Sequence, residues 1–316
     1  MAVPIRIVLY APDASTATTT AEAAFARIHA LNAILSDYDA RSELRQLGNT
    51  ATGGKTARVS NDLWQVLARA RALADQSGGA FDPTVGPVVR LWRRARRNRQ
   101  LPAPEAIEAA RALVGYDLLR LDPDKQTVEL LKPGMRLDLG GIAKGYAADE
   151  ALRVLRNFGL NRALVDAGGD IVLGDPPPDQ AGWHIAIAPL EADGPPSRVL
   201  SLCRTAIATS GDTWQFVEID GRRYSHIVDP RTGLGLTDHS SVTIVAPDGT
   251  AADGLASAVS VLGPQKGIEL IEGMPGTAAF IVRAPDGKLE THASRRWQEL
   301  PVAVAPSPDE ATREVP

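Results

Sequence analysis

The 316-residue sequence has one cysteine, no long apolar run and no excess of positive charge. The single cysteine, Cys203, cannot form a disulfide within the chain, and it excludes a metal site built from several cysteines. Many proteins of oxidising compartments also lack disulfides, so the compartment stays open. No apolar run approaches the roughly 18 residues that span a bilayer. The formal net charge of −4 provides no overall positive field, so we expect no nucleic-acid partner.

The two ends of the chain carry little structural signal. The N-terminal MAVPIRIVLYAPDAS lacks the basic-then-apolar pattern of a signal peptide. We therefore expect a cytoplasmic protein if this is the full chain. If a leader was trimmed, we expect a periplasmic protein, or one anchored on the outer side of the inner membrane. The C-terminal segment is Pro-rich, and a disordered tail is predicted over residues 301–316.

Hydrophobic periodicity and turn residues predict an α+β fold with helices inserted among hairpins. Apolar residues at helical spacing predict a helix over 19–36, and Ser60 or Asn61 would cap another that ends at Gly78-Gly79. A helix over 250–262 and a second one from Pro264 follow near the end of the chain. Because the strands do not alternate regularly with helices, parallel βαβ units are not expected. Residues 163–174 are predicted to form two strands joined by a glycine turn. The other predicted strands cover residues 3–10, 117–121, 126–131, 135–139, 183–188, 197–202, 212–220, 223–228, 241–246, 277–283 and 288–291.

A glycine turn with charged residues stands in the stretch LDLGGIAKGYAADE, residues 137–150. Glycines let the backbone approach a ligand, and the free N–H groups at a new helix start favour an anion. A lysine in the first helical turn, here Lys144, opposes the helix dipole unless an anion lies nearby. The pattern is equally typical of a tight strand–helix turn capped by Asp138, and it leaves both interpretations open.

A carboxylate and a hydroxyl lie four residues apart on the predicted helix over 250–262. Asp253 and Ser257 would share one face of that helix. Oxygen ligands of this kind suit Mg²⁺, which binds few protein oxygens and keeps waters or substrate phosphates. The alternative is an Asp that stabilises the helix dipole and a Ser that bonds back to its own helix.

Other polar features are less specific. GNTATGGKT (48–56) lacks the first glycine of a phosphate-binding loop, because Asn49 stands in its place, and we interpret it as a surface turn. His226 precedes an Asp-Pro turn, and the histidines show no metal-ligand spacing. Residues 90–99 hold six arginines, which could contact phosphates or an acidic partner but are more typical of a solvated face.

Taken together, motifs along most of the chain resemble the ApbE family of FAD:protein FMN transferases. The resemblance runs from about residue 1 to 300, with the motifs in the family's order. The motifs are Ser36-Asp37-Tyr38, Gly79 to Trp92, Asp138 to Asp149, Gly168-Gly169-Asp170, Thr209 to Gly211, Ser225 to Gly233, and Ala252-Asp253 followed by Ser257.

The resemblance implies a fold and a set of site residues. The fold would be a single ApbE-like, T-fold-related domain over residues 1–300, with mixed sheets and a flavin cleft between two sub-regions. His226 and Asp253 would be catalytic, and the pKa of His226 could suit a base near neutrality. The Mg²⁺ ligands would be Asp253, Ser257 and the backbone carbonyl of Gly141. The FAD contacts would be Met1, Tyr38, Ala80, Phe81, Asp82, Asp138, Lys144 and Val228.

The chain departs from the family pattern in four places. Ser257 replaces a threonine, which keeps the oxygen but loses the methyl that fixes the rotamer. Met1-Ala2-Val3 replaces Met-Gly-Thr at the edge of the flavin pocket. Arginines replace the glycine-rich stretch after Leu91-Trp92. The sequence starts about where the family's mature catalytic domain would begin, so we expect that a leader was trimmed.

The activity implied by the resemblance is Mg²⁺-dependent transfer of FMN from FAD to a threonine hydroxyl of an acceptor flavoprotein, with release of AMP. Family acceptors include flavin-carrying subunits of Nqr- and Rnf-type ion pumps, with an FMN-binding domain. Two alternatives use the same residues: an Mg²⁺-dependent FAD pyrophosphatase that forms FMN and AMP, and a protein that stores FAD without turning it over.

Overall fold

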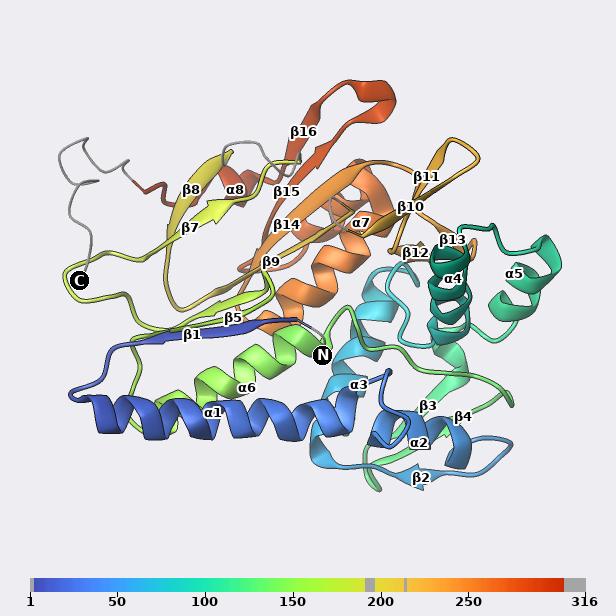
Figure 1. Ribbon diagram of the computed structural model, residues 1–316, viewed down its shortest axis with the longest axis horizontal. Coiled ribbons are helices and arrows are strands. Elements are labelled where there is room, and N and C mark those ends of the chain that lie inside the picture. The colour runs from blue at the N-terminus through green and yellow to red at the C-terminus, as the bar shows by residue number, and fades with distance from the viewer. Residues whose placement is uncertain (1–2, 191–196, 213–214, 304–316) are drawn as a thin grey trace.

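A seven-stranded antiparallel sheet forms the centre of the computed structural model, which describes residues 3–190, 197–212 and 215–303 (Figure 1). The strand order is β1-β5-β6-β9-β14-β15-β16, so neighbours in the sheet are not always neighbours in sequence. The bounds are β1 (Ile5–Leu9), β5 (Ala163–Ala167), β6 (Ile171–Leu173), β9 (Ala206–Gly211), β14 (Ser240–Ala246), β15 (Ala278–Arg283) and β16 (Glu290–Ala293).

The two faces of the sheet are covered differently. Four helices belong to the main apolar core on one face: α1 (Ala14–Leu35), α3 (Asn61–Gln76), α6 (Ala143–Asn157) and α7 (Gly249–Glu272). The opposite face carries the hairpin β7 (Trp183–Ile187)–β8 (Arg198–Leu202) and the short helix α8 (Arg295–Glu299). Side chains alternate accordingly, because successive strand residues point to opposite faces. In β5, Val165 packs toward the helices and Leu164 toward the hairpin.

Two smaller sub-structures lie beside the sheet at the right of Figure 1. One holds α2 (Glu43–Thr50) and a three-stranded sheet of β2 (Ala57–Arg58), β4 (Thr127–Leu130) and β3 (Leu119–Asp122). The other, here called the side lobe, holds α4 (Gly86–Asn98), α5 (Pro104–Arg111), β10 (Phe216–Ile219), β11 (Arg222–Ser225), β12 (Val228–Asp229) and β13 (Leu234–Gly235). Buried Trp92 connects α4 to the strands of the side lobe. Its indole N–H donates to the Gly233 carbonyl at 2.8 Å, and the centre of its ring lies 5.1 Å from the centre of the Tyr224 ring. Two 3₁₀ turns, Tyr116–Leu118 and Pro285–Gly287, complete the described elements.

The α+β prediction is confirmed, and the structure contains the predicted helix cap, hairpin turn and helix break. The Ser60 hydroxyl accepts a hydrogen bond from Leu63 N and caps α3. Asp220 and Gly221 both have positive φ, as a tight hairpin between β10 and β11 requires. The helical run of α7 is interrupted at Gly263, with φ of 74°, directly before Pro264. No helix among the described residues is long and apolar enough to cross a membrane.

Several predicted boundaries were wrong. Residues 135–139 form no strand beyond an isolated bridge from Arg136 to Val85, because this segment runs beside residues 83–86. Strand β9 was not predicted, and α1 begins at Ala14, where Asp13 caps a polar first turn without apolar periodicity. The predicted tail begins too early, since residues 301–303 pair with β8. The rest of that tail, residues 304–316, lies outside the described residues.

Candidate functional site

A cleft of about 430 Å³ opens where the side lobe meets the central sheet and its helices. Its wall includes residues from α4, β9, β12 and α7, and from the turn before α6. Met1 lies outside the described residues. All the other predicted site residues line this one cleft: Tyr38, Ala80, Phe81, Asp82, Asp138, Gly141, Lys144, His226, Val228, Asp253 and Ser257. Their individual roles stay predictions.

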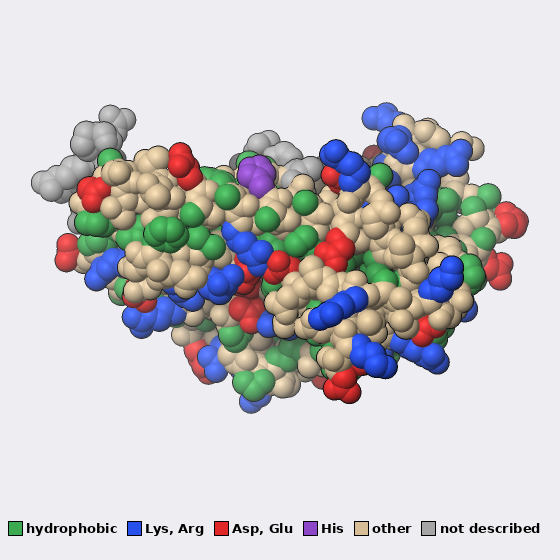
Figure 2. Space-filling model, turned by 90° about the horizontal axis from the view of Figure 1, so that it is seen from below, with side chains coloured by type: hydrophobic (Ala, Val, Ile, Leu, Met, Phe, Trp, Pro, Cys, Tyr) green, Lys and Arg blue, Asp and Glu red, His purple; other side chains and the backbone are tan. Residues whose placement is uncertain are grey.

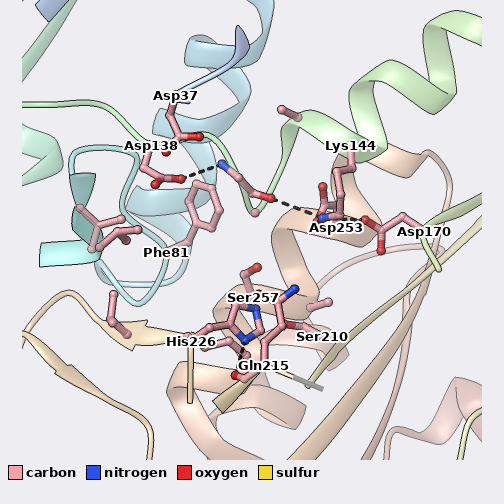
Figure 3. Close-up of a pocket in the computed structure, with 18 of the residues that line it drawn as sticks. Asp37, Phe81, Asp138, Lys144, Asp170, Ser210, Gln215, His226, Asp253 and Ser257 are labelled. Atoms are coloured by element: carbon pink, nitrogen blue, oxygen red, sulfur yellow. Dashed lines mark hydrogen bonds and ion pairs between the residues drawn. The ribbon is translucent and has the colours of Figure 1, made fainter. Parts of the chain in front are cut away.

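Lys144 in the first turn of α6 has two carboxylate partners from distant parts of the chain. Its Nζ lies 2.9 Å from Asp253 Oδ1 and 2.8 Å from Asp170 Oδ2, and it also donates to the Gly140 carbonyl at 3.3 Å. In Figure 3 the lysine side chain points toward both carboxylates. Burial by itself lowers the pKa of Lys144, but the two carboxylates outweigh it and raise that pKa above its ordinary value. These carboxylates supply the anions that a lysine at a helix start requires.

The turn also brings α6 and α7 unusually close together. Gly145 N donates to Asp253 Oδ2 at 3.1 Å, so both oxygens of that carboxylate are held from α6. A Cβ on Gly145 would lie 1.9 Å from the Gly249 carbonyl oxygen, closer than any side chain can come. Asp149, one turn further along α6, accepts hydrogen bonds from Gly249 N and Thr250 N at the start of α7. The glycines therefore allow a helix crossing that places Asp253 next to Lys144.

The residues predicted to hold Mg²⁺ fit an oxygen-donor site. A Cβ on Gly141 would lie 2.7 Å from the Ser257 hydroxyl, so the backbone of this glycine and the hydroxyl meet directly. Asp253 lies one turn before Ser257 on α7 and is 4% exposed. One carboxylate, one hydroxyl and one carbonyl leave open positions for waters or phosphate, as Mg²⁺ prefers. The described residues contain no group of three or more His, Cys, Asp or Glu side chains that could hold a metal, and the site depends on this smaller set.

The prediction that the pKa of His226 suits a base near neutrality was wrong. Burial lowers the pKa of His226 to about 4, and the positive charges of Arg96 and Lys144 act in the same direction. The imidazole is therefore neutral at pH 7. Its Nδ1 lies 3.1 Å from the Gln215 carbonyl oxygen, which can only accept, so Nδ1 carries the proton and Nε2 keeps a free lone pair.

The arginine run is more than a solvated face, because Arg93 belongs to the cleft. Its guanidinium pairs with Asp37 and with Asp138 Oδ2, the latter at 3.1 Å, and lies 4.2 Å from the centre of the Tyr38 ring. Burial, with the neighbouring Asp37 charge, raises the pKa of Asp138, and Arg93 opposes that rise. Arg93 thus joins the loop that carries Tyr38, which is 68% exposed, to the turn that carries Asp138.

Several other residues that line the cleft were not among the predicted site residues. Asp170 is buried, and burial together with Asp253 raises the pKa of Asp170. Thr209, Ser210 and Gln215 also line the cleft, and Figure 3 shows Ser210 and Gln215 near His226. Asp170, Thr209 and Ser210 lie in quoted motifs, so the motifs themselves were the available signal. Asp82, in contrast, is held by its own turn, where its Oδ1 accepts from Thr84 N and Oγ1.

Comparisons with known proteins identify the family of this chain. A family model described as the ApbE family matches residues 1–281. The chain is 33% identical over 299 residues to a FAD:protein FMN transferase of Haemophilus influenzae, covering 91% of this chain and 86% of the relative. It is 36% identical over 260 residues to the one of Treponema pallidum, covering 78% of this chain and 72% of the relative.

Solved structures give the same result. An ApbE protein of Thermotoga maritima superposes with a TM-score of 0.85 and 31% identity, over 95% of this chain and 96% of that one. A flavin transferase ApbE of Vibrio cholerae superposes with a TM-score of 0.82 and 29% identity, over the same shares. The resemblance of the motifs is therefore confirmed over most of the chain, and this protein belongs to the ApbE family.

Proposed function

We propose that this chain transfers FMN from FAD to a threonine hydroxyl of an acceptor flavoprotein, with Mg²⁺, and releases AMP. The relatives named FAD:protein FMN transferase support the reaction class. The observation that carries the proposal is the cluster at the start of α6 and on α7. Lys144 lies between two carboxylates, and the Gly141 backbone lies against Ser257, all in one cleft.

The proposed step exchanges one P–O bond for another. The threonine oxygen forms a bond to the FMN phosphorus, and the bond from that phosphorus to the bridging oxygen breaks. AMP leaves with the bridging oxygen, and the threonine loses its proton. Bound Mg²⁺ would neutralise charge that develops on the phosphoryl oxygens.

The residues of the chain have distinct parts in this proposal. Gly141, Asp253 and Ser257 would hold the metal, while Lys144 keeps the Asp253 carboxylate oriented from the other side. Neutral His226 offers Nε2 as an acceptor for the threonine proton, because Nδ1–H is held by Gln215. A low pKa makes His226 a weak base, so we expect proton transfer to follow, not precede, attack on phosphorus.

The acceptor class and the compartment are linked. FMN-binding domains of Nqr- or Rnf-type pumps are the acceptors we propose, on the ground of the family alone. An acceptor of that kind would place this enzyme in the periplasm or on the outer side of the inner membrane, and a cytoplasmic acceptor would place it in the cytoplasm.

A metal titration of turnover tests the site assignment. We expect Asp253→Asn to lower turnover at limiting Mg²⁺ by roughly a hundredfold or more, because loss of a residue that only supports a metal ligand already costs about 10–100-fold. Asp124→Asn, at an exposed position outside the cleft, is the matched control and should keep wild-type turnover. Wild-type turnover by Asp253→Asn at limiting Mg²⁺ would contradict the metal assignment. FMN and AMP formed at full rate without an acceptor would instead support the pyrophosphatase, and intact FAD under all conditions would support storage.

A further inference from the structure

Helix α4 has three faces with different surroundings. Val88, Trp92 and Ala95 are buried in the side lobe. Val89 and Arg93 line the cleft, together with Val85 at the N-cap. The third face points to solvent and is made of Arg90, Arg94 and Arg97, here called the arginine stripe.

The arginine stripe has no counter-charges in the part of the chain that the structure describes. All three side chains are exposed, and no ion pair or hydrogen bond of the described residues involves them. Other positive groups lie nearby instead. Burial lowers the pKa of Arg136, and the neighbouring charges of Arg45 and Arg90 lower it further. Figure 2 shows several Lys and Arg side chains gathered toward the end of the molecule that carries α4 in Figure 1.

Helix stability does not account for this arrangement. Arg97 in the last turn of α4 favours the helix dipole, but Arg90 lies only five positions into the helix. Like charges four residues apart, as in Arg90 and Arg94, slightly destabilise a helix. The stripe thus opposes folding slightly, in a chain whose net charge is negative.

The stripe lies on α4 beside Arg93, which lines the cleft. Residues four apart on a helix are offset by only about 40° around its axis, so Arg97 is the angular neighbour of Arg93. Arg93 lies over the exposed ring of Tyr38. A macromolecule whose hydroxyl enters the cleft along this side would therefore pass over the stripe.

We propose that the arginine stripe of α4 is a docking surface for an acidic face of the acceptor protein, beside its target threonine. This proposal rests on the proposed function, because that function requires a second protein at the cleft. Charge complementarity would steer the acceptor and set its orientation, while the cleft holds FAD. The stripe spans about 10 Å along one helix, which suits one patch of a protein interface better than the longer basic track that follows a nucleic-acid backbone.

Binding of labelled peptides, measured by fluorescence anisotropy, tests this without any turnover. Two peptides share the acceptor sequence D-G-x-T-S-G-A-T, which the resemblance to the ApbE family implies. One peptide has glutamates on both flanks of this sequence, and the other has glutamines. The stripe variant is Arg90→Gln/Arg94→Gln/Arg97→Gln. The matched control is Lys55→Gln/Arg58→Gln/Arg156→Gln, at exposed positions that do not line the cleft. Both variants lower the formal charge by three.

We expect the stripe variant to bind the glutamate-flanked peptide roughly tenfold more weakly than the control variant at low salt, and the difference to vanish at high salt. The glutamine-flanked peptide and FAD should bind both variants equally. Equal binding of the glutamate-flanked peptide by both variants would overturn the proposal. Stripe-dependent binding of phosphatidylglycerol vesicles or double-stranded DNA, without stripe-dependent peptide binding, would overturn it too.

Failure of the proposed function would be recognised separately. If wild-type protein binds the peptide through the stripe but forms no FMN adduct on an acceptor, the reaction is wrong and the docking surface stands. If the adduct forms at wild-type KM for the acceptor in the stripe variant, the reaction stands and the docking surface is wrong.

Discussion

Replacing Gly145 by alanine tests whether the close crossing of α6 and α7 builds the site. The new Cβ would lie 1.9 Å from the Gly249 carbonyl oxygen and 2.4 Å from its carbonyl carbon, whereas real Cβ contacts stay above 3.0 Å. The two helices would have to separate by at least about 1 Å. Overpacking typically costs about 1–3 kcal/mol, and a clash this close with backbone atoms belongs at the upper end of that range, while the better helix propensity of alanine offsets about 1 kcal/mol. We therefore expect a net loss of about 2 kcal/mol.

Thermal unfolding followed by circular dichroism measures that loss. For a chain of 316 residues, about 2 kcal/mol corresponds to a fall in Tm of roughly 3 °C. Gly48→Ala in α2 is the matched control, because its Cβ would meet nothing closer than 3.7 Å. We expect the control to keep or slightly raise Tm. The separation should also weaken Mg²⁺ binding by Gly145→Ala, since Gly145 N holds Asp253. Equal Tm values for the two variants would refute the reasoning.

Three further predictions concern single side chains. Asp149→Asn should destabilise the fold by about 1–3 kcal/mol in urea unfolding. Gly249 N and Thr250 N donate to different oxygens of Asp149, and the new asparagine has an NH₂ group in place of one of them. Unchanged stability would contradict the role of Asp149 in holding the start of α7. Arg93→Ala should raise KM for FAD several-fold while Arg94→Ala does not, because only Arg93 joins the two loops of the cleft; equal KM values would contradict this. The pKa of His226 is lowered to about 4, below its ordinary value of 6.5. Folding stability should therefore fall as pH drops from 6.5 toward 4, and it should fall less in His226→Asn. Equal losses of stability between pH 7 and pH 5 in the wild type and in this variant would contradict the prediction.

Local signals explain what could be predicted of the fold. The Ser60 cap, the Asp220-Gly221 turn and the break before Pro264 each depend on a few adjacent residues, and the structure has all three. The segment 135–139 was misassigned because its pairing depends on residues 83–86, which are distant in sequence. An extended backbone and an alternating pattern do not reveal whether a sheet partner exists.

In the candidate site too, local motifs predicted some features, while others depend on contacts between distant parts of the chain. The motifs predicted which residues line the cleft, but the charge state of the cleft depends on long-range contacts. Asp253, which holds Lys144, lies 109 residues away in sequence. The low pKa of His226 arises from burial, which the sequence around it does not show. Arg93 looked like one more surface arginine because its partners, Asp37 and Asp138, lie on separate loops.

The stoichiometry of the reaction tests the central claim most directly. Wild-type protein is incubated with FAD, Mg²⁺ and an FMN-binding acceptor domain, and AMP and the intact mass of the acceptor are measured in the same sample. We predict one AMP released for each acceptor that gains the mass of FMN through its threonine, and neither product when that threonine is replaced by valine. Release of AMP without a matching acceptor adduct would contradict it.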